Sequence, residues 1–257
     1  MPDGCADSFG RFGGRARQTP AQRAARMADR LVTVAIVLVL GLAAALSGYS
    51  LWDSYQVTRG ADAIKDSGLS FAELRAINPD VVAWLTLDGT GIDYPVCKGE
   101  DDFEYLSKNA KGEPSASGSI FLDAACDENF TEPYEVVMGH HMEGGKMFGD
   151  LEKFLKRKFF DAHRTGTLKL SGRTLSLEVC AVLTADAYDG AIYGVPVQAA
   201  GMDRVISRID ELATRKRGEG PKATDQLVAL STCSSDGSNA RTVVVCRVTG
   251  AVAANNA

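Results

Sequence analysis

The chain is poor in the residues that most often carry catalysis or covalent cross-links, with six cysteines and three histidines in 257 residues. Six cysteines over this length are too few for a disulfide-stabilised scaffold. The sequence also lacks a GxSxG elbow, an HExxH pair, a CxxC pair and a Walker phosphate loop. These absences argue against the serine hydrolases, zinc peptidases, dithiol oxidoreductases and nucleotide-binding proteins that those motifs define.

An excess of basic residues is missing as well, because the formal net charge is −5. A nucleic-acid-binding domain would carry a basic surface, so no nucleic-acid partner is expected. The charge is unevenly distributed. Residues 1–30 contain six arginines and three aspartates, a local charge of +3, and residues 31–52 carry no charge, so the remainder carries −8.

The uncharged stretch, residues 31–52, has the length and composition of a transmembrane helix. Twenty-two residues at a rise of about 1.5 Å span about 33 Å, which matches the hydrocarbon core of a bilayer. Tyr49 and Trp52 lie at its far end, where aromatic rings favour the membrane interface. We expect an uncleaved membrane anchor here.

Two alternatives to this anchor fit the sequence less well. A cleaved signal peptide has a shorter apolar region nearer the N-terminus, although residues 43–48 resemble a cleavage site. A buried core helix is less compatible with a stretch that is apolar on every face and follows a basic tail. The arginine excess predicts that residues 1–30 lie in the cytoplasm and that the chain from Asp53 onward lies outside the cell. The composition of residues 1–30, rich in arginine, glycine and alanine, predicts a disordered tail.

Residues 53–70 are expected to form a polar stalk, and the region beyond them alternates between strand and helix patterns. Ser70 and Glu73 form a capping-box signature for a short helix that Pro79 ends. Apolar periodicity predicts helices over residues 147–160 and 202–217. Strand patterns cover residues 81–87, 92–96, 117–123, 134–140, 166–170, 173–185, 225–233 and 241–248. This order predicts a mainly β fold, a closed or nearly closed barrel with helices inserted in its loops, because a doubly wound sheet would need a helix after nearly every strand.

Two of these strands end at residues capable of chemistry. His140 follows an apolar strand and Gly139, and strand-end loops commonly carry catalytic groups. Cys233 ends the strand before a polar loop, and Arg241 begins the next strand. An antiparallel pair would bring this cysteine and arginine together, where a guanidinium favours the thiolate and can bind a developing oxyanion; an arginine that merely ends an edge strand is the simpler interpretation.

The other histidines and cysteines have simpler interpretations. His140 and His141 are adjacent, so their side chains point to opposite faces of an extended chain and no metal site is predicted there. His163 is expected at the surface. Cys180 and Cys246 lie inside apolar strands, where a small buried side chain is expected. Cys97 and Cys126 lie in loops and could pair, which spacing alone does not decide.

Taken together, these segments resemble the class B sortases, the membrane-anchored cysteine transpeptidases of Gram-positive bacteria. The resemblance is carried by residues 77–96, 104–123, 136–154 and 230–248 and by the helix before the cysteine strand. It implies a sortase-type catalytic barrel over residues 71–250, followed by a short C-terminal tail over residues 251–257.

The resemblance also implies roles for individual residues. Cys233 is the nucleophile, His140 the catalytic histidine and Arg241 the catalytic arginine, with no cofactor. The substrate is a secreted protein with a C-terminal sorting signal, and the acceptor is an amine of the cell-wall precursor or of a pilin. The loop after Cys233 is shorter than in familiar members, so Asp236 has no assigned role, and His141 is expected to be structural.

Several alternatives stay open at this level. A membrane-tethered cysteine peptidase would use the same residues and release its acyl group to water, and a non-catalytic wall-binding barrel would keep the fold alone. A thiol–disulfide oxidoreductase is disfavoured by the missing CxxC pair. The sorting motif, the acceptor, the choice between wall anchoring and pilus polymerisation, and the protonation states of Cys233 and His140 are not decided by the sequence.

Overall fold

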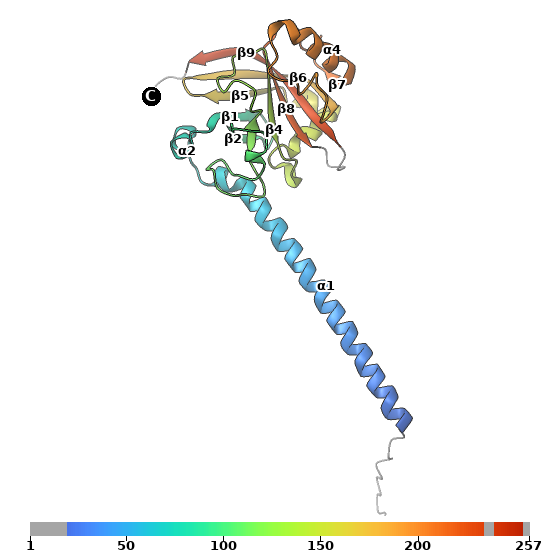
Figure 1. Ribbon diagram of the computed structural model, residues 1–257. Coiled ribbons are helices and arrows are strands. Elements are labelled where there is room, and N and C mark those ends of the chain that lie inside the picture. The colour runs from blue at the N-terminus through green and yellow to red at the C-terminus, as the bar shows by residue number, and fades with distance from the viewer. Residues whose placement is uncertain (1–19, 234–238, 254–257) are drawn as a thin grey trace, which may run out of the picture. The chain divides into compact units, whose positions relative to one another are not determined.

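The computed structural model describes residues 20–233 and 239–253 (Figure 1). The helices are α1 (Pro20–Asp66), α2 (Phe71–Ile77), α3 (Arg157–Ala162) and α4 (Met202–Leu212), with short 3-10 turns η1 (Glu104–Leu106), η2 (Glu143–Gly145), η3 (Gly149–Leu155) and η4 (Ala199–Gly201). The strands are β1 (Val81–Leu87), β2 (Asp93–Cys97), β3 (Ile120–Leu122), β4 (Tyr134–Gly139), β5 (Thr165–Leu170), β6 (Arg173–Asp186), β7 (Ala213–Lys216), β8 (Leu227–Cys233) and β9 (Ala240–Ala253).

The chain divides into two compact units, with the boundary between Asp53 and Ser54. Helix α1 contains an apolar stretch, Arg26–Trp52, that is long enough to cross a membrane and is not buried against protein. The helix begins at Pro20, so the expectation of a disordered tail is wrong for residues 20–30. Alanine, glutamine, arginine and methionine dominate this segment and favour helix, and proline is well suited to a first helical position. Residues 1–19 lie outside the described part.

The predicted capping box is present at the start of α2. The Ser70 backbone N–H donates to the Glu73 carboxylate over 2.9 Å, and the Glu73 backbone N–H donates to the Ser70 hydroxyl over 3.3 Å. Both donors would otherwise have no partner at a helix start. The buried side chains of Phe71 and Leu74 then attach this helix to the beginning of the barrel.

The strands form a closed barrel, as the sequence predicted. The hydrogen-bonded order is β5-β1-β2-β3-β4-β8-β9-β6, and β6 pairs back with β5 to close the ring. The pairs β2–β3 and β4–β8 are parallel and the other pairs are antiparallel. Closure leaves no free sheet edge within the ring, which protects the barrel from pairing with other chains.

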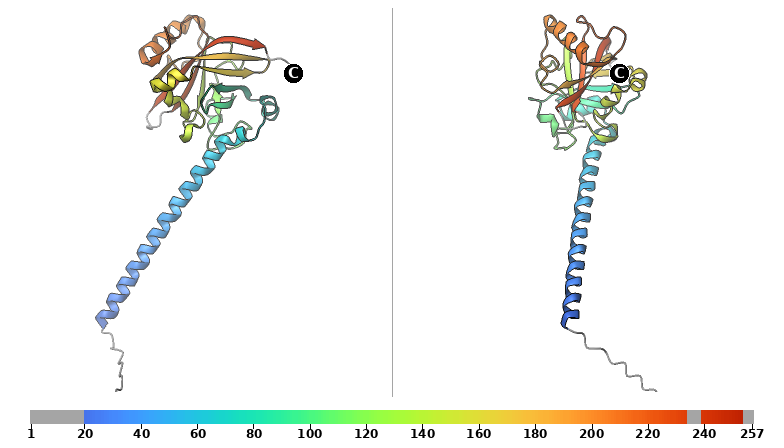
Figure 2. Two further views of the ribbon diagram at one scale, coloured as in Figure 1. Left: turned by 180° about the vertical axis from the view of Figure 1, so that it is seen from behind. Right: turned by 90° about the vertical axis from the view of Figure 1, so that its right-hand side faces the viewer.

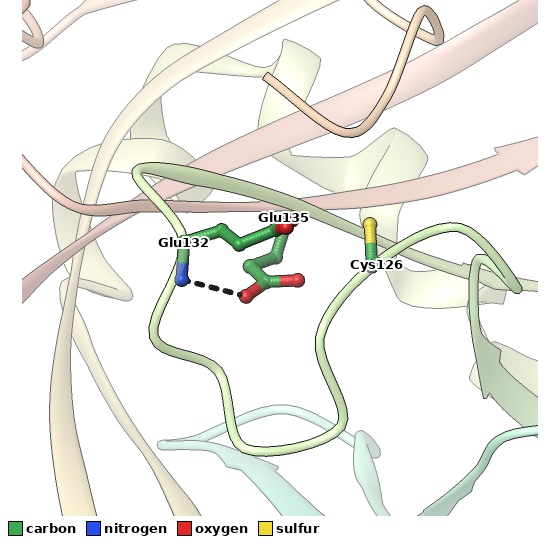
Figure 3. Close-up of side chains that lie close together, drawn as sticks. All are labelled: Cys126, Glu132 and Glu135. Carbon is green, nitrogen blue, oxygen red and sulfur yellow. Dashed lines mark hydrogen bonds between the residues drawn. The ribbon is translucent and has the colours of Figure 1, made fainter. Parts of the chain in front are cut away.

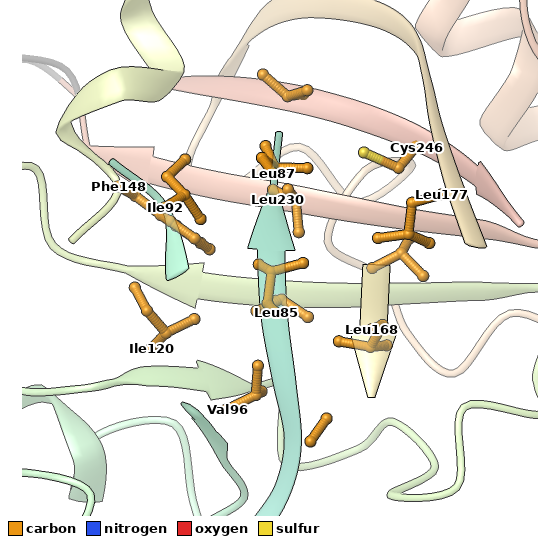
Figure 4. Packing of buried hydrophobic residues seen from close by; sticks show 14 of the residues in the cluster. Leu85, Leu87, Ile92, Val96, Ile120, Phe148, Leu168, Leu177, Leu230 and Cys246 are labelled. Carbon is orange, nitrogen blue, oxygen red and sulfur yellow. The ribbon is translucent and has the colours of Figure 1, made fainter. Parts of the chain in front are cut away.

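The inside of the barrel is filled by apolar side chains that alternate along each strand, here called the lumen core (Figure 4). Val137 from β4, Leu230 from β8 and Val244 from β9 are fully buried members. Burying each such side chain stabilises the fold by about 1.5–3 kcal/mol. Because this burial is favourable, the apolar face of each strand is the face that points inward.

A second apolar cluster, here called the outer core, covers the opposite face of β4, β6, β8 and β9. Helix α4 packs onto it through Met202, Val205 and Ile209 and lies outside the barrel wall (Figure 2). Strand β6 has a bulge between Val179 and Ala181. The extra residue shifts the alternation by one, so odd-numbered residues face the lumen core before the bulge and the outer core after it.

Three expected element boundaries are wrong. The helix expected over residues 202–217 ends at Leu212, and residues 213–216 form β7 on β6, where tertiary pairing outweighs helical propensity. The helix expected over residues 147–160 is divided into η3 and α3 at Lys156. The expected tail is strand as far as Ala253, because β9 pairs along the full length of β6.

Candidate active site

Three neighbouring strands bring the positions of the predicted catalytic residues together at one end of the barrel. Strands β4 and β8 are parallel, with Gly139 paired to Thr232. Strands β8 and β9 are antiparallel, with Cys233 paired to Arg241. The backbone of Cys233 therefore lies between Arg241 on one side and His140, the next residue after β4, on the other.

These three positions also share one face of the sheet. Along β4, β8 and β9 the lumen-core residues alternate with outer-core residues, so two-residue steps stay on one face. Position 140 is in phase with Val136, position 233 with Ala229, and position 241 with Val243, all of which belong to the outer core. The candidate site is thus on the outside of the barrel wall.

Gly139 allows β4 to end where it does. A Cβ atom at this position would collide with the Ile120 side chain and would lie 3.1 Å from the Phe148 ring. Both neighbours are buried in the lumen core, so neither has space to move away. A side chain directly before His140 would therefore require Ile120 and Phe148 to shift.

His140 is partly buried, and one of its ring nitrogens has a defined partner. The Nε2 atom lies 2.9 Å from the backbone carbonyl oxygen of Leu106. A carbonyl oxygen only accepts, so Nε2 carries the hydrogen and donates it. In the neutral ring Nδ1 is then the basic atom, which is how a histidine with one fixed nitrogen exchanges protons at the other.

Leu106 is the last residue of η1, and hydrogen bonds from neighbouring segments hold η1 in position. The Ser119 backbone N–H donates to the Tyr105 carbonyl over 2.9 Å, and the Tyr105 hydroxyl donates to Asp80 over 2.7 Å. Gly118, with φ of +58°, leaves room for these groups, since a Cβ atom there would lie 2.7 Å from the Leu106 oxygen and 3.0 Å from Cδ2 of His140. Sequence reasoning missed these residues, because their role depends on backbone atoms far away in the chain.

The strand that carries Cys233 is attached to the loop between β6 and α4. The hydroxyl groups of Ser231 and Tyr193 lie 2.8 Å apart, and the Tyr134 hydroxyl donates to the Ile192 carbonyl over 3.0 Å. Ser231 is two residues before Cys233 and so on the same face of β8. This loop therefore contacts the face of β8 that carries position 233. Residues 234–238, including Asp236, lie outside the described residues.

The remaining histidines are held in structural contacts. Nδ1 of His141 lies 3.5 Å from the Glu152 carboxylate, and its backbone forms a bridge with Met147. His163 stacks on Phe159 with ring centroids 3.8 Å apart and contacts the Phe159 carbonyl through Nδ1. His163 is half-buried rather than a surface residue, and neither ring takes the place of His140.

Four further cysteines have described side chains, and all four are buried free thiols. Cys180 and Cys246 are buried in the strands, as expected. Cys97 and Cys126 are not joined, so the disulfide that the sequence left open is absent between them. Burial raises the pKa of Cys180 to about 12 and raises those of the other three as well. Thiols that stay protonated and inaccessible are poor nucleophiles.

Comparison with known proteins identifies the family. No family model matches the chain. Sortase B of Listeria monocytogenes is 30% identical over 166 residues, which cover 64% of this chain and 67% of the relative. The crystal structure of Clostridium perfringens sortase B superposes with a TM-score of 0.65 at 33% identity, covering 70% of this chain and all of that one. A Streptococcus pyogenes class B sortase involved in pilus biogenesis gives 0.63 at 33% identity, covering 70% and 98%.

The barrel and these relatives define a cysteine transpeptidase of the sortase fold. The chain belongs to the class B sortases.

Proposed function

We propose that Cys233 is the nucleophile of this transpeptidase, with His140 as acid–base and Arg241 as the group that binds the oxyanion or orients the substrate backbone. The observation that carries the proposal is the register of β4, β8 and β9, which aligns the three positions on one face at one strand end. The other cysteines with described side chains are buried, which leaves position 233 as the candidate at a strand end beside the histidine.

The reaction proceeds through two acyl transfers. His140 takes the thiol proton as the Cys233 sulfur attacks a backbone carbonyl of the sorting signal, and it gives a proton to the leaving amine as the carbon–nitrogen bond breaks. An incoming amine then attacks the thioester, the carbon–sulfur bond breaks, and the proton lost by the amine passes through His140 to the sulfur, which restores the thiol. Covalent catalysis divides one difficult step into two easier ones. A guanidinium beside the carbonyl stabilises the negative charge of each tetrahedral intermediate.

The donor substrate we propose is a secreted protein with a C-terminal sorting signal, and the acceptor is an amine of the cell-wall precursor or of a pilin. A related structure comes from a protein involved in pilus biogenesis, and that relationship does not distinguish the two acceptors here. Genomic neighbours that encode C-terminal sorting signals would identify the donor.

We also propose that α1 anchors the enzyme, with residues 31–52 in the membrane, residues 1–30 in the cytoplasm, residues 53–70 as a stalk and the barrel outside. The apolar, unburied stretch Arg26–Trp52 and the arginines before it support this orientation. Tethering raises the effective concentration of an enzyme near membrane-linked substrates. Intact mass and protease accessibility of the barrel in whole cells test the anchor against a cleaved signal peptide.

The catalytic assignment is tested with the full chain in detergent and peptides copied from sorting signals of the same genome. We expect intact mass spectrometry to trap a thioacyl adduct in the wild type and in Cys97→Ala, and no adduct in Cys233→Ala with its fold retained. An adduct that persists in Cys233→Ala would refute the assignment. Product that is purely hydrolytic and unchanged by added glycine peptide or lysine would instead favour the tethered peptidase.

A further inference from the structure

A thiol and two carboxyl groups lie together at the end of β4 remote from His140. They belong to Cys126 in the β3–β4 loop, Glu132 just before β4, and Glu135 within it, and one ligand atom from each lies within 4.8 Å of the others (Figure 3). Glu135 is five residues before His140, which corresponds to about 16 Å along a strand. The cluster is therefore separate from the site proposed for transpeptidation.

Glu135 is fully buried, yet half of its carboxylate has no partner. Its Oε1 atom accepts from the Glu132 backbone N–H over 3.2 Å, whereas Oε2 has no such partner and the neighbouring polar side chain is the Cys126 thiol, which lowers the pKa of the carboxyl group against the larger effect of burial. Oε2 of Glu132 is buried without a partner as well. Within the described residues neither glutamate forms an ion pair, and the charged neighbours acting on Glu135 are the acidic Glu132 and Asp127. Buried anions of this kind need a compensating cation or a proton.

The thiol of Cys126 has the surroundings of a metal ligand. It is free, and the backbone N–H of Val136 donates to its sulfur over 3.4 Å. Burial raises the pKa of this thiol, so it is protonated without a metal; the hydrogen bond to its sulfur opposes that shift and orients the side chain, as outer contacts do for ligands in metal sites. Cys126 is therefore held facing the two carboxyl groups by the strand that carries one of them.

Glu132 connects the cluster to the surface of the protein. It also lines an open surface cavity of about 630 Å³, together with Asp203 and Asp225, and Asp225 is ion-paired with Arg247 over 2.8 Å. Glu132 thus belongs to both the cluster and the cavity, so a cation from solvent would reach the cluster through this side chain, and water could fill a remaining coordination position.

We propose that Cys126, Glu132 and Glu135 bind a divalent metal ion of the zinc type. A thiolate ligand selects zinc-like ions over calcium and magnesium, which prefer oxygen ligands alone. Zinc bonds of about 2.0–2.3 Å at tetrahedral angles place ligand atoms about 3.5 Å apart, so the cluster closes by about an ångström on binding. The thiol proton and any carboxyl proton leave to solvent.

The ion would tie the β3–β4 loop to β4 and act on stability rather than on catalysis. The test uses the full chain in detergent with Cys233→Ala as background, because the nucleophile and His140 are themselves possible zinc ligands. Thermal unfolding is measured with zinc chloride and with a chelator. A ligand at about 100 times its Kd raises the melting temperature of a domain of this size by about 5–10 °C, which is the expected shift.

Matched variants locate the effect. We expect Cys126→Ser and Glu135→Gln to abolish the zinc shift, while Cys97→Ser, another buried thiol, and Glu128→Gln, an exposed glutamate in the same loop, keep it. Glu135→Gln keeps the shape of the side chain and decides the question if Cys126→Ser does not fold. Cobalt in place of zinc should give a thiolate charge-transfer absorption band that Glu128→Gln retains and Cys126→Ser loses.

Three results would overturn the proposal. The first is no zinc shift and no heat of binding in the Cys233→Ala protein, in which case Glu135 is simply a protonated buried acid. The second is a shift of equal size in Cys126→Ser and Glu135→Gln, which would place the ion elsewhere. The third is stabilisation by calcium or magnesium alone. None of these results bears on Cys233, so the transpeptidase assignment is tested separately.

Discussion

The two faces of β4, β8 and β9 serve different purposes. The inward face carries Val137, Leu230 and Val244, which are fully buried in the lumen core of a closed barrel. The outward face is covered by the outer core, to which α4 and the loop before it contribute, and its positions 140, 233 and 241 lie at the strand ends. One set of strands thus supports the fold with alternate residues and carries the candidate site at the ends of the others.

This division predicts that stability and activity can be changed separately. An inward substitution leaves a cavity in a closed, well-packed interior, whereas an outward substitution at a strand end removes a polar group without opening the barrel. Substitutions on the inward face should therefore lower the free energy of unfolding, whereas substitutions at the outward strand ends should lower the catalytic rate.

The largest effect is expected for Arg241→Lys, which keeps the charge and loses the planar fork of donors. A donor that stabilises an oxyanion contributes about 10²–10³-fold to rate, and lysine does not reproduce bidentate geometry. We expect kcat/KM for transpeptidation to fall by about that factor, with little change in the melting temperature. Activity within about threefold of wild type would remove Arg241 from the site.

Leu230→Ala tests the opposite face of the same strand. Leu230 is fully buried, and truncating a buried leucine costs about 2–5 kcal/mol of unfolding free energy. Denaturant unfolding should show this loss, while kcat at low temperature, per folded molecule, stays near wild type. A large loss of kcat with unchanged stability would contradict the separation of the faces.

Gly118→Ala should affect both properties moderately. The added Cβ would press on the Leu106 carbonyl and His140, and φ of +58° disfavours any residue with a side chain. We expect a loss of about 1–3 kcal/mol in stability and a fall in kcat that exceeds the effect on KM. Gly112→Ala, also at positive φ but with open space around it, is the control for backbone strain alone.

The last expected effect is a pH dependence of stability in the metal-free protein. Burial raises the pKa of Glu135 to about 8. The folded state therefore holds this proton more tightly than the unfolded state, so stability falls as pH rises from about 4.5 through 8, by at most about 1.4 kcal/mol per pH unit. Urea unfolding across this range should show the slope, and Glu135→Gln should flatten it. An equal slope in both proteins would refute the assignment to Glu135.

Much of the fold follows from short-range patterns. The capping box at Ser70, the strand of residues 81–87 and the hairpin of residues 166–170 and 173–185 are found where expected, because local hydrogen bonds and alternation dictate them. The errors occur where a tertiary partner decides. Residues 213–216 leave the helical pattern because β6 offers them hydrogen bonds, and β9 continues to Ala253 for the same reason.

The candidate site likewise combines features that the local sequence encodes with features that only tertiary packing creates. The strand ending at Cys233, the glycine before His140 and the position of Arg241 are visible in the sequence, since strand patterns and turns are encoded locally. The contact of His140 with the Leu106 carbonyl, the space that Gly118 leaves and the buried group around Glu135 arise only when distant segments pack. Side-chain types determine which chemistry is possible, and the closure of the barrel determines which of them meet.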